Sequence, residues 1–189
     1  MTAESQPPSS PPGTGIKTAP DVWVDDRDRW RFKDEIIRNE EVLGYFKANL
    51  HRDDEGYFIE NRWGERVENG YLRGVFGFPL RAIRLHFLDG LSVEFLLDSG
   101  ALTVASLTEL FYLDEHTIGF LETNARLPIR LSAQAMVQMS ERLVIDDEDR
   151  VWFQIPDSKK FTLPLSSREE IFPGTPPHYE PGAAAATEI

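Results

Sequence analysis

The chain has 189 residues, 41% of them hydrophobic and 11% aromatic, and it carries a formal net charge of -12. This length fits one domain of ordinary size, and the apolar content is enough for a packed core without disulfides or metals. The absence of cysteine excludes disulfide scaffolds, thiolate zinc sites and cysteine nucleophiles. Because so acidic a surface repels phosphate backbones, we expect no nucleic-acid partner.

Both ends of the chain have the composition of disordered tails. Residues 1–20 are rich in Pro and Ser, with Ile16 the only bulky apolar residue after Met1, and 173–189 have the same character. We therefore expect one globular domain over 21–172. The N-terminus has no basic region followed by an apolar core, and no stretch approaches the roughly 18 apolar residues of a membrane span, so we expect a soluble, cytoplasmic protein.

The first predicted elements are a hairpin and a helix. β-forming residues flank an Asp-rich centre in 22–32, which predicts two short strands around a polar turn. Asn39 fits the N-cap of an amphipathic helix over about 40–51, with two glutamates in its first turn. Its apolar positions at helical spacing are Leu43, Phe46 and Leu50. Gly56 should close the polar stretch that ends the helix, and the chain then looks mostly β.

A second hairpin is predicted between Leu80 and Leu97. The sequence Leu88-Asp89-Gly90 fits a three-residue loop with Gly in the left-handed conformation. The register that follows has two buried pairs and two exposed pairs: Ile83–Phe95 and Leu85–Val93, then Arg84–Glu94 and His86–Ser92.

The remaining patterns complete an α+β prediction in which hairpins build a mainly antiparallel sheet. Ser106 and Glu109 form a capping box, yet apolar runs flank a polar turn in 111–121, and we favour a hairpin there. Ser132 fits the cap of a second, short helix over about 133–142, after which strand character returns.

A short acidic sequence occurs twice. Val24-Asp25-Asp26-Arg27-Asp28-Arg29-Trp30 recurs nearly intact as Ile145-Asp146-Asp147-Glu148-Asp149-Arg150-Val151-Trp152. The repetition indicates either two structurally similar halves or the same type of turn at two places, in which Asp side chains cap their own backbone. We favour the second interpretation because the residues after each copy do not align.

The first copy continues in a way that resembles DUF1285, a bacterial family of unknown function. The resemblance rests on a Trp-bearing hairpin, an Ile, a helix with Leu and Phe, a Gly-Tyr strand and a Val-Glu pair: Trp30, Ile37, Leu43, Phe46, Gly56, Tyr57, Val67 and Glu68. Asp34 stands where the family would have a glycine. The resemblance covers about the first half of the folded region and implies a fold but no reaction.

The candidate ligand-binding residues lie in an arginine-bearing stretch. Residues 71–81 combine glycines, aromatics and arginines in a chain poor in positive charge, and glycines allow close backbone approach while arginines bind carboxylate or phosphate. We therefore predict an anion site formed by Arg73, Arg81, Arg84 and His86. The alternative is a bent strand whose arginines pair with surface acids.

Structural roles explain the other conspicuous polar residues better than functional ones. Three acidic clusters, 25–28, 53–55 and 146–149, could supply oxygen ligands to a cation such as calcium, but none has EF-hand spacing and solvated turns explain them more simply. The histidines have no metal-binding spacing: they are His51, His86, His116 and His178. Glu60, Glu65 and Glu68 surround a charged turn at Trp63-Gly64. We predict no metal, cofactor or catalytic residue.

The sequence leaves three hypotheses for function. The preferred one is a non-enzymatic binding or regulatory module for a small anionic ligand or a protein partner. The second is a small enzyme that binds an anionic substrate through Arg81 or Arg84 and uses His86 or Glu68 as proton carrier. The third is an adaptor whose Pro-rich N-terminus offers extended segments to a partner.

Overall fold

The computed structural model describes residues 15–88, 90–114, 116–145, 151–154 and 160–172. The fold is α+β, and most strand pairs are antiparallel. One buried hydrophobic cluster extends through it, from Val24 and Trp30 in the first hairpin to Phe172 near the C-terminal helix. Phe95 and Phe120 stack within it with ring centroids 4.6 Å apart. Among the described residues, no helix is long and apolar enough to cross a membrane.

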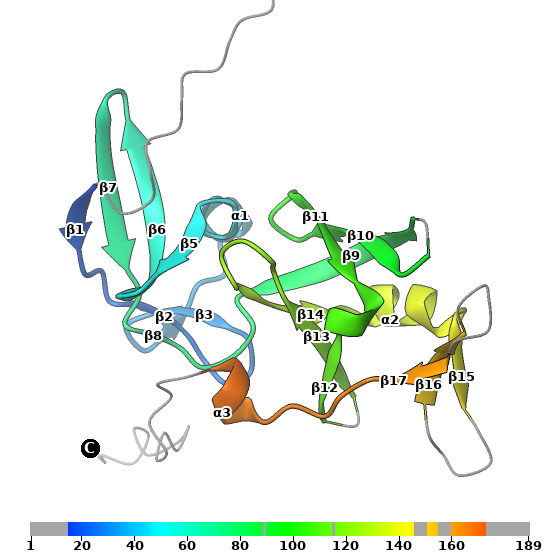
Figure 1. The fold of residues 1–189 in the computed structure, drawn as a ribbon. Coiled ribbons are helices and arrows are strands. Elements are labelled where there is room, and N and C mark those ends of the chain that lie inside the picture. Colours follow the sequence, from blue (N-terminus) through cyan, green and yellow to red (C-terminus); the bar gives the residue numbers. More distant parts are fainter. Residues whose placement is uncertain (1–14, 89, 115, 146–150, 155–159, 173–189) are drawn as a thin grey trace, which may run out of the picture.

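The largest sheet among the described residues has six strands (Figure 1). In spatial order its strands are β11 (Leu102–Ser106), β10 (Ser92–Leu97), β9 (Leu80–Phe87), β14 (Pro128–Leu131), β13 (Thr117–Leu121) and β12 (Phe111–Asp114). All neighbours are antiparallel except β9 and β14, which are parallel. This long-range pair joins the two meanders β9–β11 and β12–β14.

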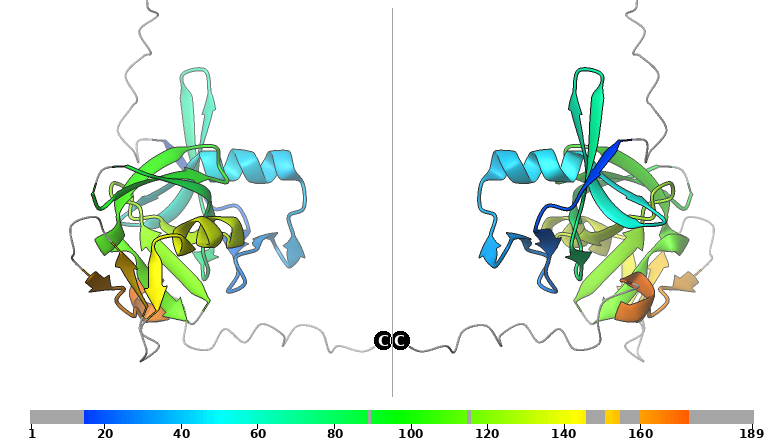
Figure 2. Two further views of the ribbon diagram at one scale, coloured as in Figure 1. Left: turned by 90° about the vertical axis from the view of Figure 1, so that its right-hand side faces the viewer. Right: turned by 90° about the vertical axis from the view of Figure 1, so that its left-hand side faces the viewer.

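The N-terminal half supplies two four-stranded sheets. The first contains β1 (Ile16–Thr18), β7 (Arg66–Tyr71), β6 (Gly56–Trp63) and β5 (Leu50–Asp53), and the second contains β4 (Glu35–Ile36), β3 (Trp30–Phe32), β2 (Val22–Val24) and β8 (Gly74–Val75). The β6–β7 hairpin projects beyond the rest of the fold (Figure 2). The pairing of Val24 with Trp30 confirms the predicted first hairpin.

Strand β1 corrects part of the predicted N-terminal tail. It lies within 1–20, where composition predicted disorder, and it pairs in parallel with β7. Two side-chain contacts help to hold it: Lys17 forms an ion pair with Glu55, and the Thr18 hydroxyl donates to Glu68 at 3.1 Å. Residues 1–14 and the predicted tail 173–189 lie outside the described residues, so the domain limits 21–172 stay a prediction.

Helix α1 (Glu40–Ala48) begins where the sequence predicts. The Asn39 side chain accepts from the backbone N–H groups of Glu41 and Val42, which confirms it as the N-cap. The helix ends before 51, because Leu50 enters β5 and is buried there. No side chain of the helix is fully buried. The amphipathic character predicted for this segment therefore remains a prediction.

The β9–β10 hairpin forms with a register shifted by two residues from the prediction. Leu85 pairs with Phe95, His86 with Glu94, and Arg84 with Leu96. The left-handed conformation predicted for Gly90 is present, with φ of 61°. The predicted loop was one residue too early, because Leu88 donates to the Ser92 carbonyl and Leu91 packs against the core.

A bulge explains why Ile83 is not on the buried face. The register shifts between Leu96 and Leu97, so that Arg84 pairs with Leu96 while Ala82 pairs with Leu97. Ile83 is the extra residue on β9, and its side chain is 37% exposed. A bulge turns the following side chains without breaking the sheet.

The remaining elements match most of the sequence patterns. Ser106 caps a short 3₁₀ helix (Leu107–Glu109) through the capping box, and the predicted hairpin follows as β12–β13. Ser132 caps α2 (Ala133–Ser140), which ends two residues earlier than predicted. A three-stranded sheet of β15 (Leu143–Ile145), β16 (Val151–Gln154) and β17 (Lys160–Thr162) and helix α3 (Arg168–Ile171) complete the described fold.

Candidate functional site

The turn between β2 and β3, residues 25–29, is organised around the buried carboxylate of Asp25. The side chain accepts hydrogen bonds from the backbone N–H groups of Arg27 and Arg29, and from the Nε atoms of Arg29 and Arg31, at 2.8–3.0 Å. Burial alone would raise the pKa of Asp25, but the hydrogen bonds from Arg31, Arg29 and Arg27 outweigh it and lower that pKa. The acidic turn is thus a self-capped structure, and Asp25 is ionised at neutral pH.

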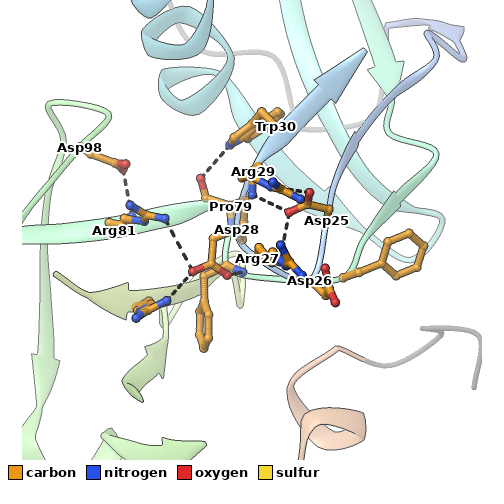
Figure 3. Close-up of polar contacts among 12 residues, drawn as sticks. Asp25, Asp26, Arg27, Asp28, Arg29, Trp30, Pro79, Arg81 and Asp98 are labelled. Carbon is orange, nitrogen blue, oxygen red and sulfur yellow. Dashed lines mark hydrogen bonds and ion pairs between the residues drawn. The ribbon is translucent and has the colours of Figure 1, made fainter. Parts of the chain in front are cut away.

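Asp28 points from the same turn toward the six-stranded sheet (Figure 3). Its backbone has a left-handed φ of 63°, which Asp tolerates better than most residues. One carboxylate oxygen accepts from the backbone N–H of Phe78 at 2.8 Å. The other accepts from Arg130 Nη1 at 2.8 Å and lies 3.8 Å from Arg81 Nη2.

The approach of the turn to the 76–79 segment requires a glycine at position 77. A Cβ there would overlap the Asp25 carbonyl oxygen and lie 2.7 Å from Asp28 Oδ1. The indole N–H of Trp30 also donates to the Pro79 carbonyl, at 3.0 Å. These contacts fix the turn against the start of β9.

Arg81 and Arg130 are direct neighbours across the parallel β9–β14 pair. Like charges in such positions repel each other unless an opposite charge lies between them, and Asp28 supplies it. The Asp28 side chain is 4% exposed, whereas the side chains of Arg81 and Arg130 remain 45% and 37% exposed. Two partly solvated positive charges therefore share one buried negative charge.

Two further contacts attach this cluster to the rest of the fold. Asp98 accepts from the Arg81 backbone N–H at 2.9 Å and from Lys47 of α1 at 2.6 Å. Arg168 of α3 donates to the carbonyl oxygens of Asp26 and Phe76, at 3.0 and 2.6 Å. Segments from both halves of the chain thus meet at the 25–29 turn.

The structure brings together three of the four predicted ligand-binding residues. Arg81, Arg84 and His86 are all exposed residues of β9, and His86 lies opposite Glu94 of β10. Arg73 precedes β8, on a different sheet, where its side chain is 65% exposed and lies 3.5 Å from Asp21. The predicted site is thus divided, with Arg81 alone joining the cluster around Asp28.

Other candidate polar groups have structural contacts. Asp53 accepts from the Tyr71 hydroxyl at 2.6 Å, and this hydrogen bond raises the pKa of Tyr71 to about 12. Glu68 lies on β7 and His86 lies on β9. These two alternative proton carriers of the enzyme hypothesis therefore belong to different sheets, and only His86 shares a strand with Arg81 and Arg84. His51 stacks on Phe58 with centroids 5.5 Å apart.

The described residues hold no cluster of three or more His, Asp or Glu side chains that could bind a metal. The third acidic cluster, 146–149, and His178 lie outside the described residues. The strands that flank this second copy of the acidic sequence do form a hairpin, in which Ile145 pairs with Val151.

Comparison with solved structures identifies the fold. The structure matches that of a DUF1285 family protein from Silicibacter pomeroyi DSS-3 with a TM-score of 0.57, covering 80% of this chain and 84% of that one at 15% sequence identity. The chain has a DUF1285-like fold. A DUF1285 family protein from Shewanella baltica OS155 matches with a TM-score of 0.46 and 15% identity, over 65% of this chain and 91% of that one. No family model and no curated protein matches the sequence.

The DUF1285-like fold identifies no reaction, because one fold supports many functions. The residues around Asp28 are therefore the candidates for a functional site. Neither Arg130 nor Asp28 is among the residues predicted for the site: the acidic sequence 25–28 was interpreted as a solvated turn, whereas the Asp28 side chain is 4% exposed. The sequence neighbours of Arg130 carry no glycine-rich or arginine-rich pattern, and only the parallel pairing of β14 with β9 places Arg130 beside Arg81.

Proposed function

We propose that this protein is a non-enzymatic binding or regulatory module that holds a small anionic molecule against the exposed guanidinium groups of Arg81 and Arg130. The recognised group would be a carboxylate or a phosphate. The observation that supports this proposal is the pairing of two arginines in register, with a single carboxylate, Asp28, between them.

Arg81 has the free hydrogen-bonding capacity that such a site needs. Its distance of 3.8 Å from Asp28 allows an ion pair but exceeds hydrogen-bonding range. Among the described residues, the Arg81 guanidinium makes no hydrogen bond. A guanidinium presents its N–H donors in a planar fork that matches carboxylate and phosphate oxygens. An anion beside Arg81 would therefore gain donors that the fold leaves unused.

The charge balance supports the same assignment. The two guanidinium groups carry two positive charges, and Asp28 supplies one negative charge, so the group has an excess of one positive charge in a chain whose net charge is -12. Partial exposure keeps both arginines within reach of a solute. A bound anion would complete the neutralisation and weaken the repulsion between the two arginines.

A regulatory role follows from the position of Asp28. The same carboxylate that faces the arginines also holds the backbone of Phe78, so an anion that competes for Arg81 and Arg130 would act on the contact between the turn and the sheet. Ligand binding would thereby be coupled to the attachment of the first hairpin.

Thermal unfolding in the presence of phosphate, pyrophosphate or citrate tests the proposal, with sodium chloride at equal ionic strength as the reference. A ligand at 100 times its Kd stabilises the folded state by about 2.7 kcal/mol. For a domain of this size the midpoint should rise by roughly 5–11 °C. At least one of the three anions should produce such a rise.

Two variants of equal charge assign the effect to the site. Arg81→Gln should weaken anion binding at least tenfold, whereas Arg84→Gln, three residues further along β9 and without an ion pair among the described residues, should leave it unchanged. The proposal fails if none of the anions stabilises the protein beyond sodium chloride. It also fails if both variants bind anions as well as the original chain does.

A further inference from the structure

The outer edge of β11 is an open end of the six-stranded sheet. Within the described part of the chain, β10 is the only strand that pairs with β11. The opposite end differs, because the backbone of Tyr112 in β12 donates to Pro164 at 2.9 Å and accepts from Ser166 at 2.8 Å. The described residues therefore cover one end of this sheet with their own backbone and leave the other end without a pairing strand.

The register identifies the peptide groups that point outward. Leu97 donates to Ala101, and Leu107 donates to Leu91, so the odd-numbered residues of this segment bond to β10. Hydrogen-bonded and non-bonded pairs alternate in an antiparallel ladder. The N–H and C=O groups of Leu102 and Val104 must therefore point away from the sheet. The N–H of Ser106 points the same way but is bonded to Glu109.

The side chains on this edge are apolar and exposed. Leu102 is 63% exposed and Val104 is 49% exposed, and their positions two residues apart place them on one face. No charged residue occurs from Ser99 to Thr108, although charged residues form 28% of the chain. Natural edge strands usually carry a charge, a proline or a bulge that prevents pairing with another strand, and β11 has none of these.

We propose that β11 pairs with β11 of a second copy of this chain, antiparallel and about a two-fold axis at Thr103. In this register Leu102 of each copy exchanges both backbone hydrogen bonds with Val104 of the other. The exposed side chains of these two residues then become cross-strand neighbours, and the two six-stranded sheets join into one continuous sheet.

A second copy fits this edge better than an unrelated strand because the edge is complementary to itself. Leu102 and Val104 supply the outward-pointing N–H and C=O groups at the centre of this edge in both copies, so a two-fold pair satisfies these groups on each side. The residues that meet are uncharged, and no like charges face each other across the pair. Repulsion between two chains of net charge -12 acts only at longer range, where salt screens it.

Sedimentation of the full chain tests the proposal. At about 100 µM, a concentration suited to an interface of modest size, the mass should be twice the 21.6 kDa of one chain. The dimer should tighten when salt rises from about 0.1 M to about 1 M, because the Debye length falls from about 10 Å to about 3 Å. Val104→Lys should give a monomer, and Ile83→Lys, which adds the same charge to a 37% exposed position of β9, should remain a dimer.

A single introduced cysteine tests the register. Because the chain contains no cysteine, Thr103→Cys creates one thiol, and the two-fold axis would place the two thiols opposite each other in a non-bonded pair. Their Cα atoms would be about 4.5 Å apart, within the range for a disulfide. Mild oxidation should convert most of this variant into a covalent dimer. Val137→Cys, at a 69% exposed position of α2, should form far less.

Each contrary result overturns the proposal. A monomer at both salt concentrations refutes the dimer itself. A dimer that persists in Val104→Lys refutes this edge as the interface. A native dimer in which Thr103→Cys is cross-linked no faster than Val137→Cys refutes the register. None of these results depends on anion binding at Arg81, so the two proposals fail independently.

Discussion

Replacement of Asp25 by alanine should destabilise the fold strongly although it changes no apolar core residue. The substitution removes the acceptor of four hydrogen bonds, two from backbone N–H groups in the turn and two from the guanidinium groups of Arg29 and Arg31. The Asp25 residue is 1% exposed, so water cannot replace the carboxylate without opening the turn.

The magnitude depends on how well the donors can be rehydrated. Removing one partner of a buried ion pair costs about 3–5 kcal/mol. The side chains of Arg29 and Arg31 are 34% and 20% exposed and so recover part of their hydration, which favours the lower end of that range. We expect a loss of about 3 kcal/mol, which lowers the midpoint of thermal unfolding by roughly 6–12 °C in a domain of this size.

Urea denaturation at neutral pH measures this loss, with Asp34→Ala as the control. Asp34 lies in the following turn, between β3 and β4, is exposed, and gives the same charge change, so its replacement should cost less than about 0.5 kcal/mol. Equal stability of the two variants would refute the assignment of Asp25 as the centre of the turn.

The pH dependence gives a second test. Folding lowers the pKa of Asp25 below its ordinary 3.8. Its stabilisation is therefore fully present above that value and is lost as the pH falls through the folded pKa. The difference between the original chain and Asp25→Ala should shrink in that acidic range. A difference that stayed constant there would show that the charge of Asp25 does not contribute.

Three further substitutions have definite expected outcomes. Gly77→Ala should destabilise by about 2–3 kcal/mol or more in urea denaturation, because the new methyl group would overlap the Asp25 carbonyl oxygen; unchanged stability would contradict the close packing of the turn. Asp53→Asn should return the pKa of Tyr71 from about 12 toward 10.0, seen as phenolate absorbance at lower pH. In the original chain, the hydrogen bond from Tyr71 to Asp53 stabilises the fold fully below pH 10, and this stabilisation is lost as the pH rises toward 12. Asp53→Asn should not show this pH-dependent loss. Asp28→Asn should lower stability by about 1–2 kcal/mol yet tighten anion binding, measured by calorimetry, and weaker binding would count against the site.

Local patterns predicted the elements that local contacts determine. Asn39 and Ser132 cap helices as expected, because an N-cap depends only on the next few residues. The ends of those helices were predicted less well, since Leu50 is drawn into β5 by burial against the core and not by helical spacing. The β9–β10 register failed for a similar reason, because the packing of Leu91 decided where the loop lies.

The site was predicted only in part because it depends on a contact between distant segments. The unusual composition of 71–81 singled out Arg81, but it also suggested Arg73, which folds onto another sheet. Arg130 is 49 positions from Arg81 in the sequence and meets it only through the parallel β9–β14 pair. Parallel pairs between separate meanders have no short-range turn signal, so periodicity cannot predict them.

Asp28 attaches the turn to Phe78 and also faces two arginines, and the presence of the second arginine supports the proposed anion site over a purely structural contact. Attachment of the turn would be served as well by one arginine as by two, since a single guanidinium can neutralise the carboxylate and satisfy its free oxygen. A second arginine in register adds repulsion that the fold must tolerate. The structure accepts that cost while leaving Arg81 at 3.8 Å, outside hydrogen-bonding range of Asp28. In the proposed site, an external anion that occupies the remaining donors of Arg81 would neutralise the surplus positive charge and weaken this repulsion.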